Sequence, residues 1–240
     1  MKIKLFTIPN LLTLGNLMCG SCAVLFLGIL RPTLAFWLVV LAAVFDFLDG
    51  FSARLLKSPS AIGIQLDSLA DMVSFGLVPA AVLIRIYGYS NAPFLCQWPV
   101  WVQFLGNLSP LLITAFSALR LAKFNVDDSQ KTEFCGLPTP ANALFCTSLA
   151  AIVASGEIVL AKEYIVLISI VCACLLISPI RMFSLKFHGF KWEGNEIRYT
   201  FLGFAALTIF ILREYSVPAI IVLYIVMSVG RNIALKCKKA

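Results

Sequence analysis

Charged residues are scarce in this chain of 240 residues. Only 13% of the residues are charged and 60% are hydrophobic, whereas about a quarter of the residues in a soluble domain are charged. The mean hydropathy is +0.94. This composition excludes an ordinary soluble fold and predicts an integral membrane protein, in which any chemistry must be built from the helices themselves.

Clusters of histidine and cysteine are also missing. His188 is the only histidine, and two of the cysteine pairs, Cys19 with Cys22 and Cys172 with Cys174, lie inside apolar runs. Because a structural zinc site needs four converging ligands, we interpret the cysteines as packing thiols. The net charge of +7 comes from basic residues between apolar runs, where topology and anionic lipid headgroups explain it. We therefore expect membrane lipids, and no nucleic acid, as partners.

Eight apolar runs follow one another along the chain. They cover residues 11–30, 34–56, 64–87, 101–122, 141–155, 164–180, 199–212 and 217–229. Because about 20 residues cross the hydrocarbon core as a helix, the runs predict an all-α, polytopic membrane bundle of about eight transmembrane helices. The seventh run is short, and the turn at Arg213 and Glu214 predicts a helical hairpin, with a re-entrant segment as the alternative.

The distribution of basic residues predicts the topology. Lys2 and Lys4 precede an apolar stretch without a cleavage pattern of small residues, so we expect the first run to be a permanent span. With eight crossings and a cytoplasmic N-terminus, only Arg31, Arg85, Lys162 and Arg213 of the 19 basic residues fall outside. This bias predicts that both termini are cytoplasmic.

No low-complexity linker and no internal repeat divides the chain. We therefore expect residues 1–240 to form a single membrane-embedded domain, with additional C-terminal helices at about 199–235.

Acidic residues are nearly absent from the first 126 residues. The four that occur, Asp46, Asp49, Asp67 and Asp71, lie within or beside the second and third apolar runs. A carboxylate at that depth costs roughly 2.5 kcal/mol or more unless it is paired, hydrated or bound to metal. The spacings of three and four residues place each pair on one helix face, and the short connecting turn allows the two pairs to face each other. Converging carboxylates need a counter-charge, and oxygen donors alone favour Mg²⁺ or Mn²⁺ over Ca²⁺.

Small residues accompany the carboxylates. Gly50, Ala53 and Gly63 would let a ligand approach the backbone, and Arg54 supplies a guanidinium fork that suits a phosphate. Together with metal ions, these groups describe a pyrophosphate site. The alternative is that the small residues only allow tight helix packing. Ser58 and Ser60 fit the turn between the helices better than catalysis.

The same residues, taken in order, resemble the signature of the CDP-alcohol phosphatidyltransferase family. The eight positions are Asp46, Asp49, Gly50, Ala53, Arg54, Gly63, Asp67 and Asp71. The resemblance implies a membrane-embedded enzyme with a six-helix core, here extended by two C-terminal helices, that is often a homodimer. Such enzymes transfer a phosphatidyl group from a CDP-linked lipid to an alcohol and release CMP.

The resemblance also implies residue roles. The metal ligands, for two Mg²⁺ or Mn²⁺ ions, would be Asp46, Asp49, Asp67 and Asp71. Asp71 would in addition be the catalytic general base. The CDP-lipid would be bound by Asn16, from an opening stretch at 9–16 that is similar to the family's, and by Asp49, Gly50, Ala53, Arg54, Gly63 and Asp67. We favour direct in-line attack on the lipid phosphorus, and a covalent phosphatidyl-aspartate remains the open alternative.

Two further segments narrow the branch of the family. Residues 120–126 and 134–141 are similar to those of integral-membrane phosphatidylserine synthases. This resemblance implies CDP-diacylglycerol and L-serine as substrates, and an active site on the cytoplasmic side of a prokaryotic cytoplasmic membrane. The serine carboxylate needs a cation, for which Arg120 is the first candidate and Lys123 the second, with Asn125 orienting the substrate. The alternative for both basic residues is anchoring at the cytoplasmic surface.

The sequence leaves other functions as alternatives. A sister branch would use glycerol 3-phosphate or inositol, although glycerol 3-phosphate should need more cationic contacts. A divalent-cation transporter could use the four aspartates as an ion path, but it would not need Arg54 and the glycines at these spacings. A silent lipid-binding scaffold would have no reason to keep four carboxylates that are costly in lipid.

Overall fold

The computed structural model describes residues 5–25, 27–28, 32–56, 60–126, 134–183, 192 and 195–237. The α-helices in these residues are α1 (Ile8–Leu25), α2 (Pro32–Leu55), α3 (Ala61–Asp71), α4 (Val78–Tyr89), α5 (Val100–Leu108), α6 (Leu111–Val126), α7 (Thr139–Ser155), α8 (Lys162–Ile177), α9 (Glu196–Leu212) and α10 (Ser216–Cys237). A π-helical segment, η1 (Met72–Leu77), joins α3 to α4, and the short 3₁₀ segments are η2 (Leu95–Gln97) and η4 (Arg213–Tyr215). The predicted all-helical class is confirmed. Lys2, Lys4, Arg31, Ser58 and His188 lie outside the described residues.

Five stretches of the described residues are long and apolar enough to cross a membrane. They are Ile8–Leu25, Pro32–Leu55, Ala61–Tyr89, Val100–Val126 and Glu196–Ala234. The apolar helix α7 is shorter, and the last stretch contains α9 and most of α10. The chain is therefore an integral membrane protein, while the count of eight spans and the orientation of the termini stay predictions.

The fourth apolar run, expected as one helix, is divided. Helix α5 ends at Leu108, and α6 begins at Leu111 after a turn at Ser109 and Pro110. Proline has no N–H group to donate to the preceding turn, and the Pro110 carbonyl accepts a short-range hydrogen bond from the Ile113 N–H at 2.9 Å. The break at the proline is the physical reason for the difference.

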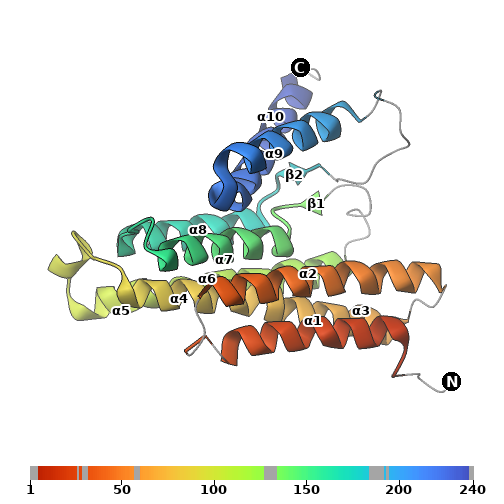
Figure 1. The fold of residues 1–240 in the computed structure, drawn as a ribbon, viewed down its shortest axis with the longest axis horizontal. Helices are drawn as coiled ribbons and strands as arrows, with labels where there is room; N and C mark the ends of the chain where they lie inside the picture. Colours follow the sequence, from red (N-terminus) through yellow and green to blue (C-terminus); the bar gives the residue numbers. More distant parts are fainter. Residues whose placement is uncertain are drawn as a thin grey trace.

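The C-terminal helices form the predicted hairpin. The turn η4 joins α9 to α10, and Arg213, at its start, has a φ of 45°. Figure 1 shows the two helices side by side, set at an angle to the bundle of α1 to α8. Helix α10 packs against α7. Whether α9 crosses the membrane or re-enters it stays open as a prediction about topology.

A pair of short strands, each of two residues, lies next to this hairpin (Figure 1). Strand β1 (Phe134–Cys135) pairs antiparallel with β2 (Arg181–Met182). Gly136 follows β1 with a φ of 77°, and its N–H donates to the Ile180 carbonyl at 2.9 Å. The Asn232 side-chain amide of α10 donates to the Arg181 carbonyl at 2.7 Å. The pair therefore ties the loops after α6 and α8 to the C-terminal hairpin.

Helix α1 packs closely against η1 because Gly20 has no side chain. A Cβ atom at Gly20 would lie only 2.8 Å from the Ser74 Cα atom. On the same side of α1, the Ser74 hydroxyl donates to the Asn16 carbonyl at 2.9 Å. These contacts fix the position of α1 along its axis relative to the end of α3.

We expect Gly20→Ala to destabilise the protein by about 1–3 kcal/mol, because the added methyl group meets backbone that cannot move away without shifting a helix. The measurement is thermal unfolding in detergent. Gly203→Ala is the matched control, since Gly203 lies within α9 and a Cβ atom there would have nothing within 4 Å, and alanine is the better helix former. Equal melting temperatures for the two variants would contradict the packing argument.

Candidate active site

Three carboxylates from α2 and α3 converge, as their spacing predicts. Each of Asp46, Asp49 and Asp67 offers a ligand oxygen, and these oxygens lie within 4.8 Å of one another. Asp49 is buried, and the other two are half-buried. The two helices therefore bring together residues that are separated by the loop between α2 and α3.

Asp71 lies beside this group at the last position of α3, immediately before η1. Its side chain is 8% exposed, and the Asn16 side-chain amide donates to its Oδ1 atom at 3.0 Å. It is close enough to Asp46 and Asp67 for their charges to interact. A π-helical segment at this position is typical of functional sites.

Thr13 of α1 is a site residue that the sequence analysis missed. Its hydroxyl donates to Asp49 Oδ2 at 2.6 Å, and its side chain is buried. Thr13 is three residues from Asn16, so both lie on one face of α1. That spacing within the opening stretch was the signal that could have revealed it.

A cavity of about 150 Å³ lies between α1, α2 and α3. It is lined by Pro9, Asn10, Thr13, Asp49, Gly50, Ala53, Ser60, Gly63, Ile64 and Asp67. Five of these residues were predicted to bind the CDP-lipid. Ser60, interpreted as a turn residue, also caps α3, because its hydroxyl accepts the Gly63 N–H at 3.0 Å.

The surroundings of Gly50 and Gly63 help to decide between the two explanations for these small residues, which are ligand access and helix packing. A Cβ atom at Gly50 would meet only the Arg54 Nη1 atom, at 3.9 Å. At Gly63, a Cβ atom would lie 3.0 Å from the Ser60 hydroxyl and 3.2 Å from Asn10 Oδ1. The open surroundings of Gly50 therefore favour access of a ligand to the backbone, whereas Gly63 is closely packed against the side chains of Ser60 and Asn10.

Two residues predicted to bind the CDP-lipid do not line this cavity. Asn16 lies beside Asp71 instead. Arg54 is exposed near Gly50, with its guanidinium next to the cavity wall. The structure therefore places Asn16 at the general-base candidate and Arg54 at the edge of the cavity.

The three residues predicted for the acceptor occupy different environments. Arg120 of α6 is buried, and its guanidinium interacts electrostatically with Asp71. Lys123 and Asn125 are exposed near the end of the same helix, and the Asn125 side-chain amide donates to the Ser68 hydroxyl at 2.8 Å. Of the three residues, only Arg120 is buried.

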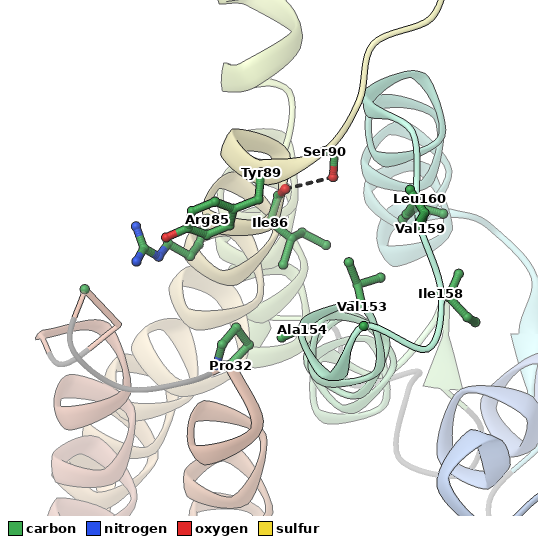
Figure 2. Close-up of a pocket in the computed structure, with 12 residues that line it drawn as sticks. Pro32, Arg85, Ile86, Tyr89, Ser90, Val153, Ala154, Ile158, Val159 and Leu160 are labelled. Atoms are coloured by element: carbon green, nitrogen blue, oxygen red, sulfur yellow. Dashed lines mark hydrogen bonds between the residues drawn. The ribbon is translucent and has the colours of Figure 1, made fainter.

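A larger cavity, of about 680 Å³, is lined by residues of α4, by the end of α7 and by the segment before α8. Figure 2 shows Arg85 and Tyr89 at one side of it and Val153 and Ile158 at the other. The Arg85 guanidinium lies 4.6 Å from the centre of the Tyr89 ring. The described residues that line this cavity include no carboxylate, so the smaller cavity is the better candidate for the active site.

The residues of the smaller site fit a hard divalent cation. Their donors are carboxylate oxygens, which Mg²⁺ and Mn²⁺ prefer. The Asp67 Oδ1 atom is buried without a hydrogen-bond partner, and such an atom in a low-dielectric site needs a compensating group. The arrangement of Asp46, Asp49 and Asp67 could therefore bind a metal ion.

Apolar spanning helices and a carboxylate cluster beside an interhelical cavity define a polytopic membrane protein with a polar site between its helices. The sequence profile of the CDP-alcohol phosphatidyltransferase family matches residues 6–177. The chain belongs to this family. The match ends at the last residue of α8, before the α9–α10 hairpin.

Curated relatives that the chain resembles are named CDP-diacylglycerol–serine O-phosphatidyltransferase. The protein of Helicobacter pylori strain J99 is 34% identical over 142 residues, 58% of this chain and 55% of the relative. The protein of Mycobacterium tuberculosis strain H37Rv is 34% identical over 157 residues, 62% and 51% of the two chains. That of Methanocaldococcus jannaschii is 31% identical over 180 residues, 74% of each. The chain thus spans about half the length of the first two relatives.

Proposed function

We propose that the protein transfers the phosphatidyl group of CDP-diacylglycerol to the hydroxyl of L-serine and releases CMP. The observation that carries the proposal is the convergence of Asp46, Asp49 and Asp67 beside a cavity. Asp71 interacts electrostatically with this group and with the buried cation Arg120. The names of the relatives support serine as the acceptor.

The diphosphate of the CDP-lipid would lie at the cavity wall formed by Gly50, Ala53 and Gly63. Arg54 at the edge would bind a phosphate oxygen through its guanidinium. We propose two Mg²⁺ or Mn²⁺ ions held by Asp46, Asp49, Asp67 and Asp71, which would neutralise charge on the diphosphate when bound. Thr13 would hold the Asp49 carboxylate in position through its hydrogen bond.

Asp71 would act as the general base. The serine hydroxyl is a weak nucleophile, and a carboxylate within hydrogen-bond reach can take its proton as the new bond forms. Asn16 would orient this carboxylate through its side-chain amide. The serine oxygen would bond to the phosphorus that carries diacylglycerol, and the phosphorus–oxygen bond to CMP would break in the same in-line step.

Arg120 would bind the serine carboxylate, because a guanidinium fork matches a carboxylate with two parallel hydrogen bonds. Lys123 and Asn125 would guide the acceptor at the exposed end of α6.

We propose eight spans with both termini in the cytoplasm, a single domain over residues 1–240 and a homodimer in the prokaryotic cytoplasmic membrane, with the site facing the cytoplasm. Reporter fusions at the C-terminus and light scattering of the purified protein test the topology and the dimer.

Purified protein should convert CDP-diacylglycerol and labelled serine to phosphatidylserine and CMP in the presence of Mg²⁺ or Mn²⁺. Parallel reactions with glycerol 3-phosphate and inositol test the sister branches. Turnover with one of these alcohols and none with serine would overturn the proposed acceptor while keeping the proposed reaction type. Release of CMP without transfer to any alcohol would contradict the transferase itself.

We expect Arg120→Lys to raise the KM for serine at least about tenfold, because lysine keeps the charge but loses the planar fork. The KM for CDP-diacylglycerol should change less than twofold. Arg85→Lys is the matched control, since Arg85 lies at the larger cavity away from the carboxylates. Equal changes in both Michaelis constants would contradict a role in acceptor binding.

A further inference from the structure

The larger cavity lies at the end of the bundle that faces away from the carboxylates. Arg85, Ile86 and Tyr89 line it from the last turns of α4. Helix α4 continues α3 through η1, and Arg85 follows Asp71 by 14 residues, which corresponds to about 20 Å along a helix. Figure 1 shows α3 towards one end of the bundle and α5, which follows α4, at the other. The cavity is therefore a site of its own, separate from the proposed transfer reaction.

The ends of membrane-spanning helices surround this cavity. Of the stretches long enough to cross a membrane, the first ends at Leu25, the second begins at Pro32 and the third ends at Tyr89. Pro32 and Tyr89 both line the cavity. Tyr89 is 67% exposed, and tyrosine is enriched at the boundary between hydrocarbon and water. A ligand in this cavity would therefore lie at the depth of the lipid headgroups.

Arg85 supplies the charge of the cavity. Its side chain is half-buried, and its guanidinium lies 4.6 Å from the centre of the Tyr89 ring (Figure 2). The ring face attracts the cation without neutralising its charge. Lys162, the first residue of α8, adds a second cation near the same end of α4, with its Nζ atom 5.1 Å from the centre of the Tyr87 ring. A phosphate matches a guanidinium fork with two parallel hydrogen bonds, so the cavity offers a partner for an anion.

The carboxylates closest to the cavity in the sequence have other partners. None of the described residues that line the cavity is acidic. Glu157 lies between two lining residues, but its Oε2 atom accepts a hydrogen bond from the Tyr215 hydroxyl at 2.6 Å. The Oε1 atom of Glu163 accepts two backbone N–H groups of the segment before α5, at 2.9 and 2.6 Å. No carboxylate from the described lining therefore balances the charge of Arg85.

The wall across from Arg85 is apolar. Figure 2 shows Val153 and Ile158 on this side, and the neighbouring lining residue Val159 is 75% exposed. An inorganic phosphate ion would lose part of its hydration against such a wall, whereas the acyl part of a lipid is compatible with it. The volume of about 680 Å³ is in the range of sites for small molecules. One cation beside apolar side chains suits an amphiphilic anion.

We propose that this cavity binds the phosphate of an anionic glycerophospholipid from the leaflet opposite the carboxylate site. Arg85 is the phosphate ligand, and the acyl chains lie along the wall of Val153 and Ile158. The bound lipid bridges the end of α4 and the end of α7, and it stabilises the folded chain because it binds the folded state and not the unfolded one. This inference goes beyond the proposed function and does not depend on it.

The test measures binding of phosphatidylglycerol to the purified full chain in detergent by native mass spectrometry, without CDP-diacylglycerol or serine. We expect the wild-type chain to bind phosphatidylglycerol more tightly than phosphatidylcholine, because the choline cation would face Arg85. Arg85→Gln should weaken phosphatidylglycerol binding at least about tenfold, the size that follows from losing hydrogen bonds from a charged group. Arg213→Gln is the matched control, since it removes one positive charge at an exposed residue of η4, and it should bind the lipid as the wild-type chain does.

A second variant tests the cavity without changing the charge. Ala154 is exposed and lines the cavity, so Ala154→Trp should fill part of the space and weaken phosphatidylglycerol binding as well. Both variants should keep the wild-type melting temperature in lipid-free detergent. Phosphatidylglycerol should raise the melting temperature of the wild-type chain more than that of either variant.

The outcomes separate a lipid from other occupants. Displacement of the lipid by inorganic phosphate would indicate a site for a free anion and overturns the proposal. Equal affinity for phosphatidylglycerol and phosphatidylcholine overturns it too, as does unchanged phosphatidylglycerol binding in either cavity variant. Because no transfer step enters these measurements, their failure leaves the proposed function intact, and absence of serine transfer leaves this inference intact.

Discussion

Asp71→Asn is expected to lower the rate of serine transfer by about 10³-fold, within the range that general acid–base catalysis contributes. Asparagine has nearly the same shape and can still contact Asn16, but it cannot accept the serine proton. Binding of CDP-diacylglycerol should remain measurable, because the cavity between α1, α2 and α3 is lined by other residues. The measurement is single-turnover formation of CMP together with equilibrium binding of the lipid.

The matched control for this variant is Glu214→Gln, which makes the same chemical change at the exposed turn η4. It should transfer serine at the wild-type rate. If Asp71→Asn keeps near-normal turnover, Asp71 is not the base. A loss of lipid binding equal to the loss of rate would instead indicate that Asp71 contributes mainly to holding the substrate.

Asp46→Asn is expected to change metal and lipid binding, unlike Asp71→Asn, which should mainly lower the rate. Asp46 belongs to the group of three carboxylates with converging oxygens, so its loss should weaken binding of the metal and of the CDP-lipid together. Groups that only orient a ligand already change metal affinity by 10–100-fold. We therefore expect the Mg²⁺ or Mn²⁺ concentration for half-maximal activity to rise at least about 100-fold, with a parallel rise in the KM for CDP-diacylglycerol.

Titration of activity with metal at several lipid concentrations checks this prediction. Saturating metal should recover much of the rate in Asp46→Asn, whereas it should not recover the rate in Asp71→Asn. An unchanged metal requirement in Asp46→Asn would show that this carboxylate is not a ligand. The two aspartate variants thus separate the metal site from the base.

The carboxylate cluster could be predicted from the sequence because its geometry is mostly local. Spacings of three and four residues determine which side chains share a helix face, and a short loop between α2 and α3 leaves few ways to arrange the two faces. The cost of a lone carboxylate in lipid then favours convergence over separation. For Asp46, Asp49 and Asp67 this reasoning was sufficient.

Contacts between helices distant in the sequence could not be predicted in the same way. The hydrogen bond from Thr13 to Asp49 joins residues 36 positions apart, and that from Asn16 to Asp71 joins residues 55 positions apart. Periodicity can place Thr13 and Asn16 on one face of α1, but it does not identify their partners on other helices.

The candidate acceptor-binding residues show that two basic side chains on one helix can differ in burial. Arg120 and Lys123 are three residues apart, and both were candidates for binding the serine carboxylate. The structure buries Arg120 and leaves Lys123 exposed. The difference depends on which neighbouring helices pack against each side of α6, and the sequence pattern of α6 alone does not report them.

The π-helical segment after Asp71 has a consequence for how this protein tolerates change. Each residue added to or removed from a helix rotates everything beyond it by about 100°. The wide turn of η1 therefore sets the rotational phase of α4 relative to the aspartates of α3. Substitutions within Met72–Leu77 keep this rotational phase, but deletion of a single residue there would turn the whole of α4 about its axis. The length of this segment is under a stricter constraint than its composition.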